Sequence, residues 1–267
     1  MLSNEEKEKV ISFVLQYEQP NGGFSFSKTT PPTREDTYYA LRILKRLDFK
    51  YSNKKTFAYL EIMLLDVHHS CRHFYQLLFL LDFFTLTGHQ ETMKNILDLP
   101  SNLQTENINE LYYFTLIRDI PSSKIEFELT NQFLLPKTPF SLNFIPEVSR
   151  RLLLLKKMNE EFEERKYIQW IQKSQSSDGG FGFLPYTTTF LENTCYALRG
   201  LQTLNATPLN LEKCEQFILQ CKTGNGGFSR KSSALGTLQA TYHAICSLEI
   251  IYQMKEGLEN RRLTNIT

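Results

Sequence analysis

Apolar residues recur at intervals of three and four along several stretches of the chain, which predicts amphipathic helices. In residues 6–18, Val10, Phe13 and Tyr17 form one apolar stripe, with Lys and Glu on the remaining surface. The same pattern occurs in residues 165–175 and 211–221. A helix with one apolar face covers a core from one side only, so we predict that these are outer helices.

A second set of helical stretches is apolar or aromatic around more of its circumference. These stretches align on a threonine, and their sequences are EDTYYALRIL around Thr37, ENTCYALRGL around Thr194 and QATYHAICSL around Thr241. A helix that is apolar on most sides is covered on most sides. We therefore predict that these are inner helices.

Weaker copies of the inner helix occur between the first and second of these stretches. They are CRHFYQLLFLL, NELYYFTLI and EVSRRLLLL, with His73, Leu111 and Ser149 at the position of the threonine. The six anchor positions are 37, 73, 111, 149, 194 and 241, and their spacing grows from 36 to 47 residues. A period in this range is typical of helical-hairpin repeats. We predict six repeats that fill the chain.

An Asn/Asp-Gly-Gly-Phe motif joins the outer helix to the inner helix in the first and the last two repeats. It is found in QPNGGFSF at 19–26, QSSDGGFGF at 175–183 and KTGNGGFSR at 222–230. Glycine adopts backbone angles that a residue with a Cβ resists, so it can end the outer helix. We expect Phe24, Phe181 and Phe228 to plug the hairpins.

Six hairpins can stack as an open solenoid or close into a ring. An open array usually ends in polar capping repeats, whereas the first repeat here is among the best preserved and the sixth is equally apolar. We therefore predict an all-α fold, an (α/α)6 toroid of six helical-hairpin repeats in a single domain over residues 1–267.

Charge and composition exclude several classes of function. Thirty basic residues balance 29 acidic ones, so no general field favours nucleic acid or an anionic membrane. The N-terminal stretch has the features of neither a signal nor a transit peptide, and no apolar run is long enough to span a membrane. Five cysteines without a CxxC pair suit reduced thiols. We expect a cytoplasmic protein.

The Gln-x-x-Asn/Asp-Gly-Gly-Phe joint, followed by Thr-(Cys/Tyr)-Tyr-Ala-Leu, resembles the repeat of protein prenyltransferase β subunits and of the β domain of triterpene and diterpene cyclases. The resemblance covers nearly the whole chain, most strongly in repeats one, five and six. It implies the toroid fold, but protein prenylation, isoprenoid cyclisation and non-catalytic scaffolding all occur on this architecture.

In a closed ring the inner helices would begin at one rim of a central cavity. Just after the anchor positions the chain is mostly aromatic, with Tyr38, Tyr39, Tyr75, Tyr112, Tyr113 and Tyr242, and Arg150 and Arg151 occupy this place in the fourth repeat. An aromatic wall below a polar rim suits an isoprenoid diphosphate, so we predict that these residues bind the substrate. The alternative is that the aromatic side chains fill a solid helical core.

The resemblance also implies a zinc ion, which prenyltransferases hold with an Asp-x-Cys pair and a later His to lower the pKa of the acceptor thiol. The nearest match is Asn193-Thr194-Cys195-Tyr196, with Glu192 beside it and His243 three residues beyond the position of the family His, where Ala240 stands. A displaced zinc site would use Cys195, His243 and Glu192. Cys195, Tyr196 and Glu192 would be the catalytic residues.

Other groups of residues offer weaker chemistry. His69 and His73 have an i,i+4 spacing that can share a metal, although histidines at a helix entrance can simply be exposed. Glu212-Lys213-Cys214 imitates an acidic-x-Cys pair, but on an outer helix. The basic cluster that holds the diphosphate in the family is replaced by uncharged LPYTTTF, so Arg150, Arg151, Arg230 or Lys231 would have to serve.

Three hypotheses follow. The first, which we adopt as the description that best captures the resemblance, is a prenyltransferase β-like enzyme that pairs with a helical-repeat α subunit and acts on a protein substrate. The second is a binding or scaffold protein that keeps the isoprenoid cavity without the chemistry. The third is a stand-alone cyclase that uses Glu35, Asp36 or Glu192, although the Asp-x-Asp-Asp motif of cyclases is absent from the sequence.

Overall fold

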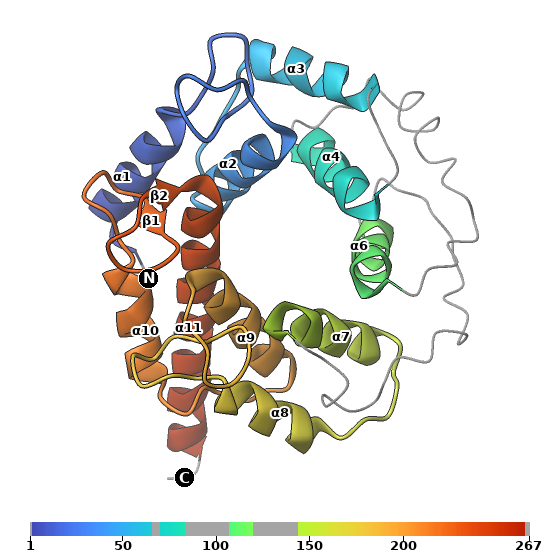
Figure 1. The fold of residues 1–267 in the computed structure, drawn as a ribbon, viewed down its shortest axis with the longest axis vertical. Helices are drawn as coiled ribbons and strands as arrows, with labels where there is room; N and C mark the ends of the chain where they lie inside the picture. The colour runs from blue at the N-terminus through green and yellow to red at the C-terminus, as the bar shows by residue number, and fades with distance from the viewer. Residues whose placement is uncertain (1, 66–69, 84–106, 120–143, 265–267) are drawn as a thin grey trace. The chain divides into compact units, whose positions relative to one another are not determined.

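The computed structural model describes residues 2–65, 70–83, 107–119 and 144–264, and these form two compact units. Unit 1 comprises Met1–Phe13 and Pro136–Thr267, and unit 2 comprises Val14–Leu135. Within each unit the described elements are almost entirely helical (Figure 1). The expectation of a single domain stays a prediction.

The helices of the described residues follow the predicted repeats. Their bounds are α1 Asn4–Leu15, α2 Arg34–Arg46, α3 Lys54–Leu65, α4 Cys71–Phe83, α6 Ile108–Arg118, α7 Ile145–Lys157, α8 Glu164–Lys173, α9 Leu191–Thr203, α10 Leu211–Gln220 and α11 Leu238–Thr264. Two short antiparallel strands, β1 Phe228–Ser229 and β2 Gly236–Thr237, pair just before α11. The outer helices expected in repeats three and four fall outside the described residues.

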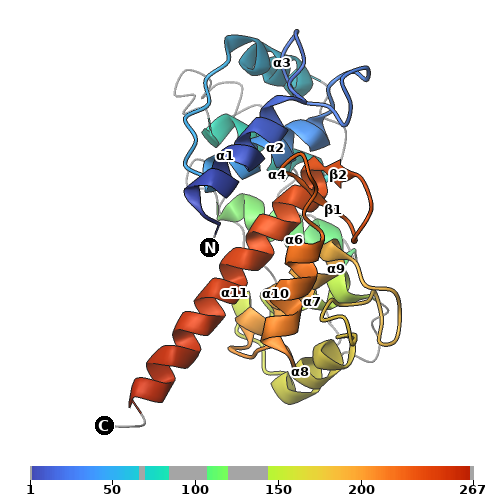
Figure 2. The ribbon, with the colours of Figure 1, turned by 90° about the vertical axis from the view of Figure 1, so that its left-hand side faces the viewer.

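Burial separates inner from outer helices as the patterns predict. Helix α9 buries nine residues, including Thr194, Cys195 and Tyr196, whereas the outer helix α8 buries only Tyr167 and Ile171. In unit 1, α9 packs against α7 and α11, and in unit 2, α4 packs against α2 and α6. Figure 2 shows α10 beside α11, which continues beyond it toward the C-terminus. The inner helices therefore form consecutive neighbours within each unit.

Each described joint is held to its inner helix by the anchor threonine. The backbone N–H of the joint phenylalanine donates to the threonine Oγ1 thirteen residues later, at 2.9–3.0 Å in all three repeats. The phenylalanines Phe24, Phe181 and Phe228 are completely buried. An apolar plug next to a buried backbone donor explains why the motif needs both Phe and Thr. The predicted hairpin plugs are confirmed.

The double glycine is required because the outer helix of the following repeat lies directly on it. A Cβ built on the first glycine would lie 2.1–2.5 Å from a lysine carbonyl oxygen of that helix. A Cβ on the second glycine would meet an aromatic ring four residues further along the same helix, at 2.4–2.8 Å. The pairs are Gly22 and Gly23 with Lys55 and Tyr59, Gly179 and Gly180 with Lys213 and Phe217, and Gly226 and Gly227 with Lys9 and Phe13.

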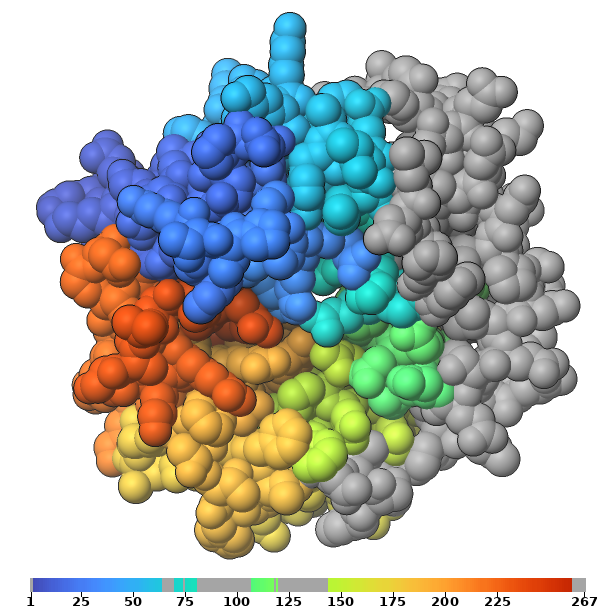
Figure 3. All heavy atoms as spheres, turned by 45° about the horizontal axis from the view of Figure 1, so that its top comes forward, coloured from blue at the N-terminus to red at the C-terminus, as the bar shows by residue number. Residues whose placement is uncertain are grey.

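The last of these contacts joins the two ends of the repeat array. Helix α1 belongs to the first repeat, yet Lys9 and Phe13 pack on Gly226 and Gly227 of the last joint. The space-filling view shows the dark blue start of the chain against the orange joint (Figure 3). The same glycine, lysine and ring contact occurs between consecutive repeats. Helix α1 therefore packs on the last joint in the way that the outer helix of a following repeat packs on the other joints. This is the contact that closure of the repeat array requires.

Candidate functional site

Arginine side chains of unit 1 reach from one inner helix to a tyrosine of the next. Arg150 on α7 donates from Nη2 to the hydroxyl of Tyr196 on α9, at 3.0 Å, and its guanidinium lies 5.0 Å from the centre of that ring. Arg199 on α9 donates to the hydroxyl of Tyr242 on α11, at 3.2 Å. Two successive helix pairs are therefore joined by the same kind of contact.

His243 completes this cluster, which we call the tyrosine–arginine cluster of unit 1 (Arg150, Tyr196, Arg199, Tyr242 and His243). Its ring centre lies 5.7 Å from that of Tyr196 and 5.5 Å from that of Tyr242. His243 is only 2% exposed, while both arginines are half-buried. Arg199 lies 5.8 Å from the Tyr196 ring, so this ring is approached by two guanidinium groups.

Unit 2 contains a second cluster in which an arginine contacts tyrosines of two inner helices. Arg42 on α2 donates to the hydroxyls of Tyr38 and of Tyr75 on α4, both at 3.1 Å, and its guanidinium lies 4.4 Å from the Phe79 ring. The Tyr75 ring lies 5.9 Å from that of Tyr113 on α6. Tyr39 and Tyr112 contact their neighbours Tyr38 and Tyr113 edge-on. Five of the six tyrosines predicted to bind substrate thus form a continuous set within this unit, while Tyr242 belongs to the cluster of unit 1.

Guanidinium groups on tyrosine rings are suited to a ligand with an anionic head and an apolar tail. A guanidinium donates several hydrogen bonds in one plane and matches phosphate oxygens, while it stacks on aromatic faces. The tyrosine rings offer apolar area, and each hydroxyl provides a polar end. Both chemical requirements of an isoprenoid diphosphate are represented in each cluster.

Arg151 differs from its neighbour Arg150. It is 7% exposed, and burial lowers the pKa of its guanidinium, which lies beside Tyr167 on α8. A buried arginine beside the tyrosine of an outer helix holds two helices together. Of the two arginines, Arg150 is the one that belongs to the cluster.

Cys195 faces α11, where its neighbour is another thiol. The side chain is fully buried, and a hydrogen bond with Cys246 together with burial holds the pKa of the Cys195 thiol well above its ordinary value. A protonated thiol is a poor metal ligand and a poor nucleophile. Glu192 lies half-buried in the first turn of α9.

The residues around Cys195 do not fit a zinc ion as they stand. Asn193, at the position of the family carboxylate, is buried, and its Nδ2 has no hydrogen-bond partner among the described residues. A neutral amide gives the cation no charge compensation. Within residues 2–65, 70–83, 107–119 and 144–264, no three His, Cys, Asp or Glu side chains are grouped closely enough to hold a metal. The zinc site stays a prediction, and we derive no step through it.

The acidic pair of the cyclase hypothesis is engaged in local structure. Thr33 caps α2 by accepting from the N–H of Asp36, and its hydroxyl donates to the Asp36 carboxylate at 2.7 Å. Glu35 forms an ion pair with Arg72 of α4. Carboxylates in the first turn of a helix are favoured by its dipole. These contacts give both residues a structural role.

The remaining candidates are spread over the chain. His69 lies outside the described residues, and the N–H of His73 donates to Ser70 Oγ at 3.3 Å. Cys214 on α10 is buried, which raises the pKa of its thiol. The guanidinium of Arg230 lies 4.0 Å from the ring centre of Phe190, the N-cap residue of α9, and Lys231 is exposed.

Two arginines of the clusters were not among the predictions from sequence. Arg42 and Arg199 both lie five residues after the anchor threonine, in YYALR and CYALR. Alignment of the two repeats would have shown this repeated position. Cys246 was identified from sequence only as one of five reduced thiols. Its contact with Cys195, which lies 51 residues earlier, depends on how α11 packs against α9.

Comparison with known proteins supports the fold. The family model described as the prenyltransferase alpha-alpha toroid domain matches residues 1–78 and 142–266. No curated protein matches the chain. In the described part of the chain, no helix combines the length and hydropathy needed to cross a membrane. The predicted all-α toroid fold is confirmed.

Proposed function

The chain belongs to the prenyltransferase α/α toroid family, and from this premise we propose that it binds an isoprenoid diphosphate. In this proposal Arg150 and Arg199 contact the diphosphate, and the rings of Tyr196, Tyr242 and His243 adjoin the first isoprene unit. The observation that carries the proposal is the approach of two guanidinium groups to the single ring of Tyr196.

Electrostatics favours the head group at these arginines. Each guanidinium donates a hydrogen bond to a tyrosine hydroxyl, which orients its plane, and a guanidinium carries five N–H donors in all. A guanidinium that is held in place loses little conformational entropy when it binds. Within unit 2, the tyrosines Tyr38, Tyr39, Tyr75, Tyr112 and Tyr113 beside Arg42 offer an isoprenoid the same kind of aromatic surface, and we propose them as a prenyl-binding surface of that unit.

The proposal is restricted to binding because the residues near Cys195 give no support to thiol activation. The protonated Cys195 thiol and the amide of Asn193 replace the charged ligands that the transfer reaction uses in the family. Transfer to a protein thiol, with zinc and a helical-repeat partner subunit, remains the alternative. Stoichiometric zinc in the purified protein that is lost in Cys195→Ala would favour this alternative.

Calorimetric titration with farnesyl and geranylgeranyl diphosphate tests the proposal. We expect Arg150→Ala and Arg199→Ala each to weaken binding about 10- to 100-fold, because a hydrogen bond to a charged group contributes roughly 1.5–3 kcal/mol. Arg165→Ala, at an exposed position on α8, is the matched control and should bind as wild type. Farnesol and inorganic diphosphate separate the contributions of tail and head. Unchanged affinity in Arg150→Ala and Arg199→Ala would contradict the proposal.

A further inference from the structure

The three joints present the same slot to an outer helix. In each, two glycines lie under a lysine carbonyl group and an aromatic ring of the incoming helix. The slot contacts only a backbone carbonyl group and an aromatic ring of the helix, and all three incoming helices provide both groups. The slot alone therefore gives no reason for a given helix to choose one joint over another.

One position in each joint distinguishes the three slots. It lies six residues before the joint phenylalanine and contacts the start of the incoming helix. Glu18 accepts from Asn53 Nδ2 at 2.5 Å, Gln175 exchanges two hydrogen bonds with the backbone of Asn210 at 2.9 and 3.0 Å, and Lys222 forms an ion pair with Glu6 at 2.7 Å. We call this position the clasp.

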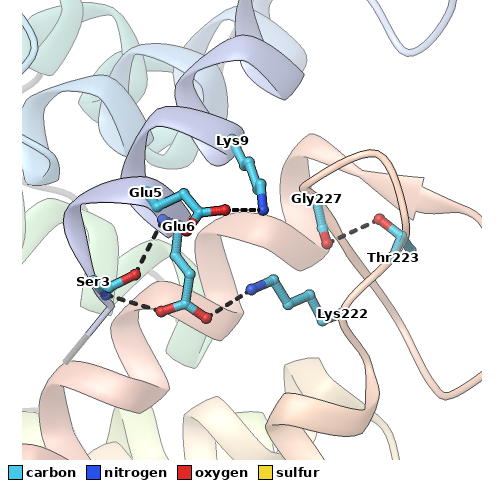
Figure 4. Close-up of polar contacts among 7 residues, drawn as sticks. All are labelled: Ser3, Glu5, Glu6, Lys9, Lys222, Thr223 and Gly227. Carbon is cyan, nitrogen blue, oxygen red and sulfur yellow. Dashed lines mark hydrogen bonds and ion pairs between the residues drawn. The ribbon is translucent and has the colours of Figure 1, made fainter.

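Figure 4 shows the clasp of the last joint, where Lys222 and Glu6 carry opposite charges. The other two described clasps, at Glu18 and Gln175, pair with uncharged groups of Asn53 and Asn210. The Glu6 carboxylate is oriented from its other side by Ser3, whose N–H donates to Oε2 at 2.9 Å. Glu6 would face a carboxylate at the Glu18 clasp and an uncharged amide at the Gln175 clasp. Like charges repel at such a distance, so the clasp disfavours docking of α1 on the first joint.

We propose that the last joint is an interaction surface for a second copy of this chain, selected by the Glu6–Lys222 pair. When α1 of one molecule leaves its own joint, the Lys222 slot accepts α1 of another molecule through the same glycines and the same ring of Phe13. The product is a dimer with exchanged N-terminal helices. Exchange of an identical element keeps the contacts of the monomer outside the connecting segment after Leu15, so its cost is low.

Charge reversal can separate docking within a chain from docking between chains. Glu6→Lys and Lys222→Glu each place like charges at the clasp of their own molecule. In a mixture of the two variants, both clasps are complementary only when the helices are exchanged. We expect each variant alone to be monomeric. After the two variants are incubated together at elevated temperature, light scattering should detect at least tenfold more dimer in the mixture than in either variant alone.

Matched variants control for changes in charge and folding. Glu5 lies in the same helical turn as Glu6, but its ion-pair partner is Lys9 on the same helix, and Lys231 is exposed just after the last joint. The control substitutions are therefore Glu5→Lys and Lys231→Glu. A mixture of these two should remain monomeric. The double variant Glu6→Lys/Lys222→Glu should protect α1 from protease as wild type does, while each single variant should be cleaved there at least fivefold faster.

A Glu6→Lys and Lys222→Glu mixture that stays monomeric, or that dimerises no more than the control mixture, overturns the proposal. A double variant whose α1 is cleaved as fast as in the single variants overturns the selection by the clasp, even where a single variant folds poorly. The proposal does not depend on isoprenoid binding.

Discussion

The joints and the tyrosine–arginine clusters lie in the same repeats, but they have diverged to very different degrees. The joints of repeats one, five and six keep the same glycines, phenylalanine and threonine, with hydrogen bonds equal within 0.1 Å. The clusters use arginines from two different positions, since Arg42 and Arg199 follow the anchor by five residues and Arg150 by one. A joint can be built from one set of residues only, whereas a contact between side chains can be made from several positions on the helix.

The physical reason is the kind of group involved. At a joint, backbone lies against backbone with no space for a Cβ, so only glycine fits. In a cluster, a long flexible side chain reaches a hydroxyl, and the same contact can begin from different turns of the helix. Four changes test this difference, beginning with the one that should have the largest effect.

Gly226→Ala should break a contact that recurs in all three described joints. The residue has φ +94°, and a Cβ would lie 2.5 Å from the Lys9 carbonyl oxygen. Strain and overpacking together should cost about 2–5 kcal/mol of unfolding free energy, measured by urea titration. Gly224→Ala in the same joint meets no atom within 4 Å and should change stability by less than about 0.5 kcal/mol. Equal effects would refute the steric explanation.

Thr194→Val removes the anchor of the fifth repeat while keeping the shape of the side chain. The buried N–H of Phe181 loses its acceptor at 3.0 Å, which should cost about 1–3 kcal/mol in the same titration. Thr203→Val, at the half-buried end of the same helix, removes only a bond to the Arg199 carbonyl group. It should cost less than about 1 kcal/mol, and a larger loss there than at Thr194 would show that the anchor is dispensable.

Tyr196→Phe tests the cluster, where we expect more tolerance. The substitution removes the acceptor of the Arg150 hydrogen bond at 3.0 Å but keeps the ring under the guanidinium. Thermal unfolding should show a loss of roughly 0.5–1.5 kcal/mol. Tyr186→Phe, at a side chain that is 94% exposed, is the control and should have no measurable effect. A loss as large as that of Gly226→Ala would remove the distinction between joint and cluster.

Glu6→Gln should have the smallest effect and the clearest dependence on pH. The hydrogen bond from Lys222, with that from Ser3, lowers the pKa of Glu6 to about 2 in the folded protein, below its value in an unfolded chain. The stabilisation is therefore present at neutral pH and is lost as the pH falls from about 5 toward 2. The pair is partly exposed, so we expect less than about 1 kcal/mol.

Stability curves measured between pH 2 and pH 7 give the test for Glu6. Wild type and Glu6→Gln should differ most near neutral pH and converge in acid. Glu8→Gln, an exposed position on the same helix, should follow wild type throughout. A constant difference at all pH values would contradict the assignment of the effect to the charged clasp.

Much of the fold was predictable because each repeat is marked by residues with strict requirements on backbone angles and on local packing. Gly-Gly-Phe followed by an anchor threonine identifies the joint, and the apolar patterns identify the two classes of helix. The candidate site was only partly predictable. Tyr38, Tyr75, Tyr196 and Tyr242 lie on the inner helices as expected, but nothing in the pattern indicates that Arg199 reaches Tyr242 or that Cys195 faces Cys246.

The sequence by itself determined the helices, the joints and the family, because backbone angles and helical periodicity depend on residues that are close together in the chain. Only the tertiary structure decided which side chains meet across neighbouring helices. It turned Arg151 toward Tyr167, placed Cys195 against a second thiol and brought Glu6 to Lys222, 216 residues away. Such contacts depend on the rotation and axial shift of whole helices, which are set by the packing of the entire interface.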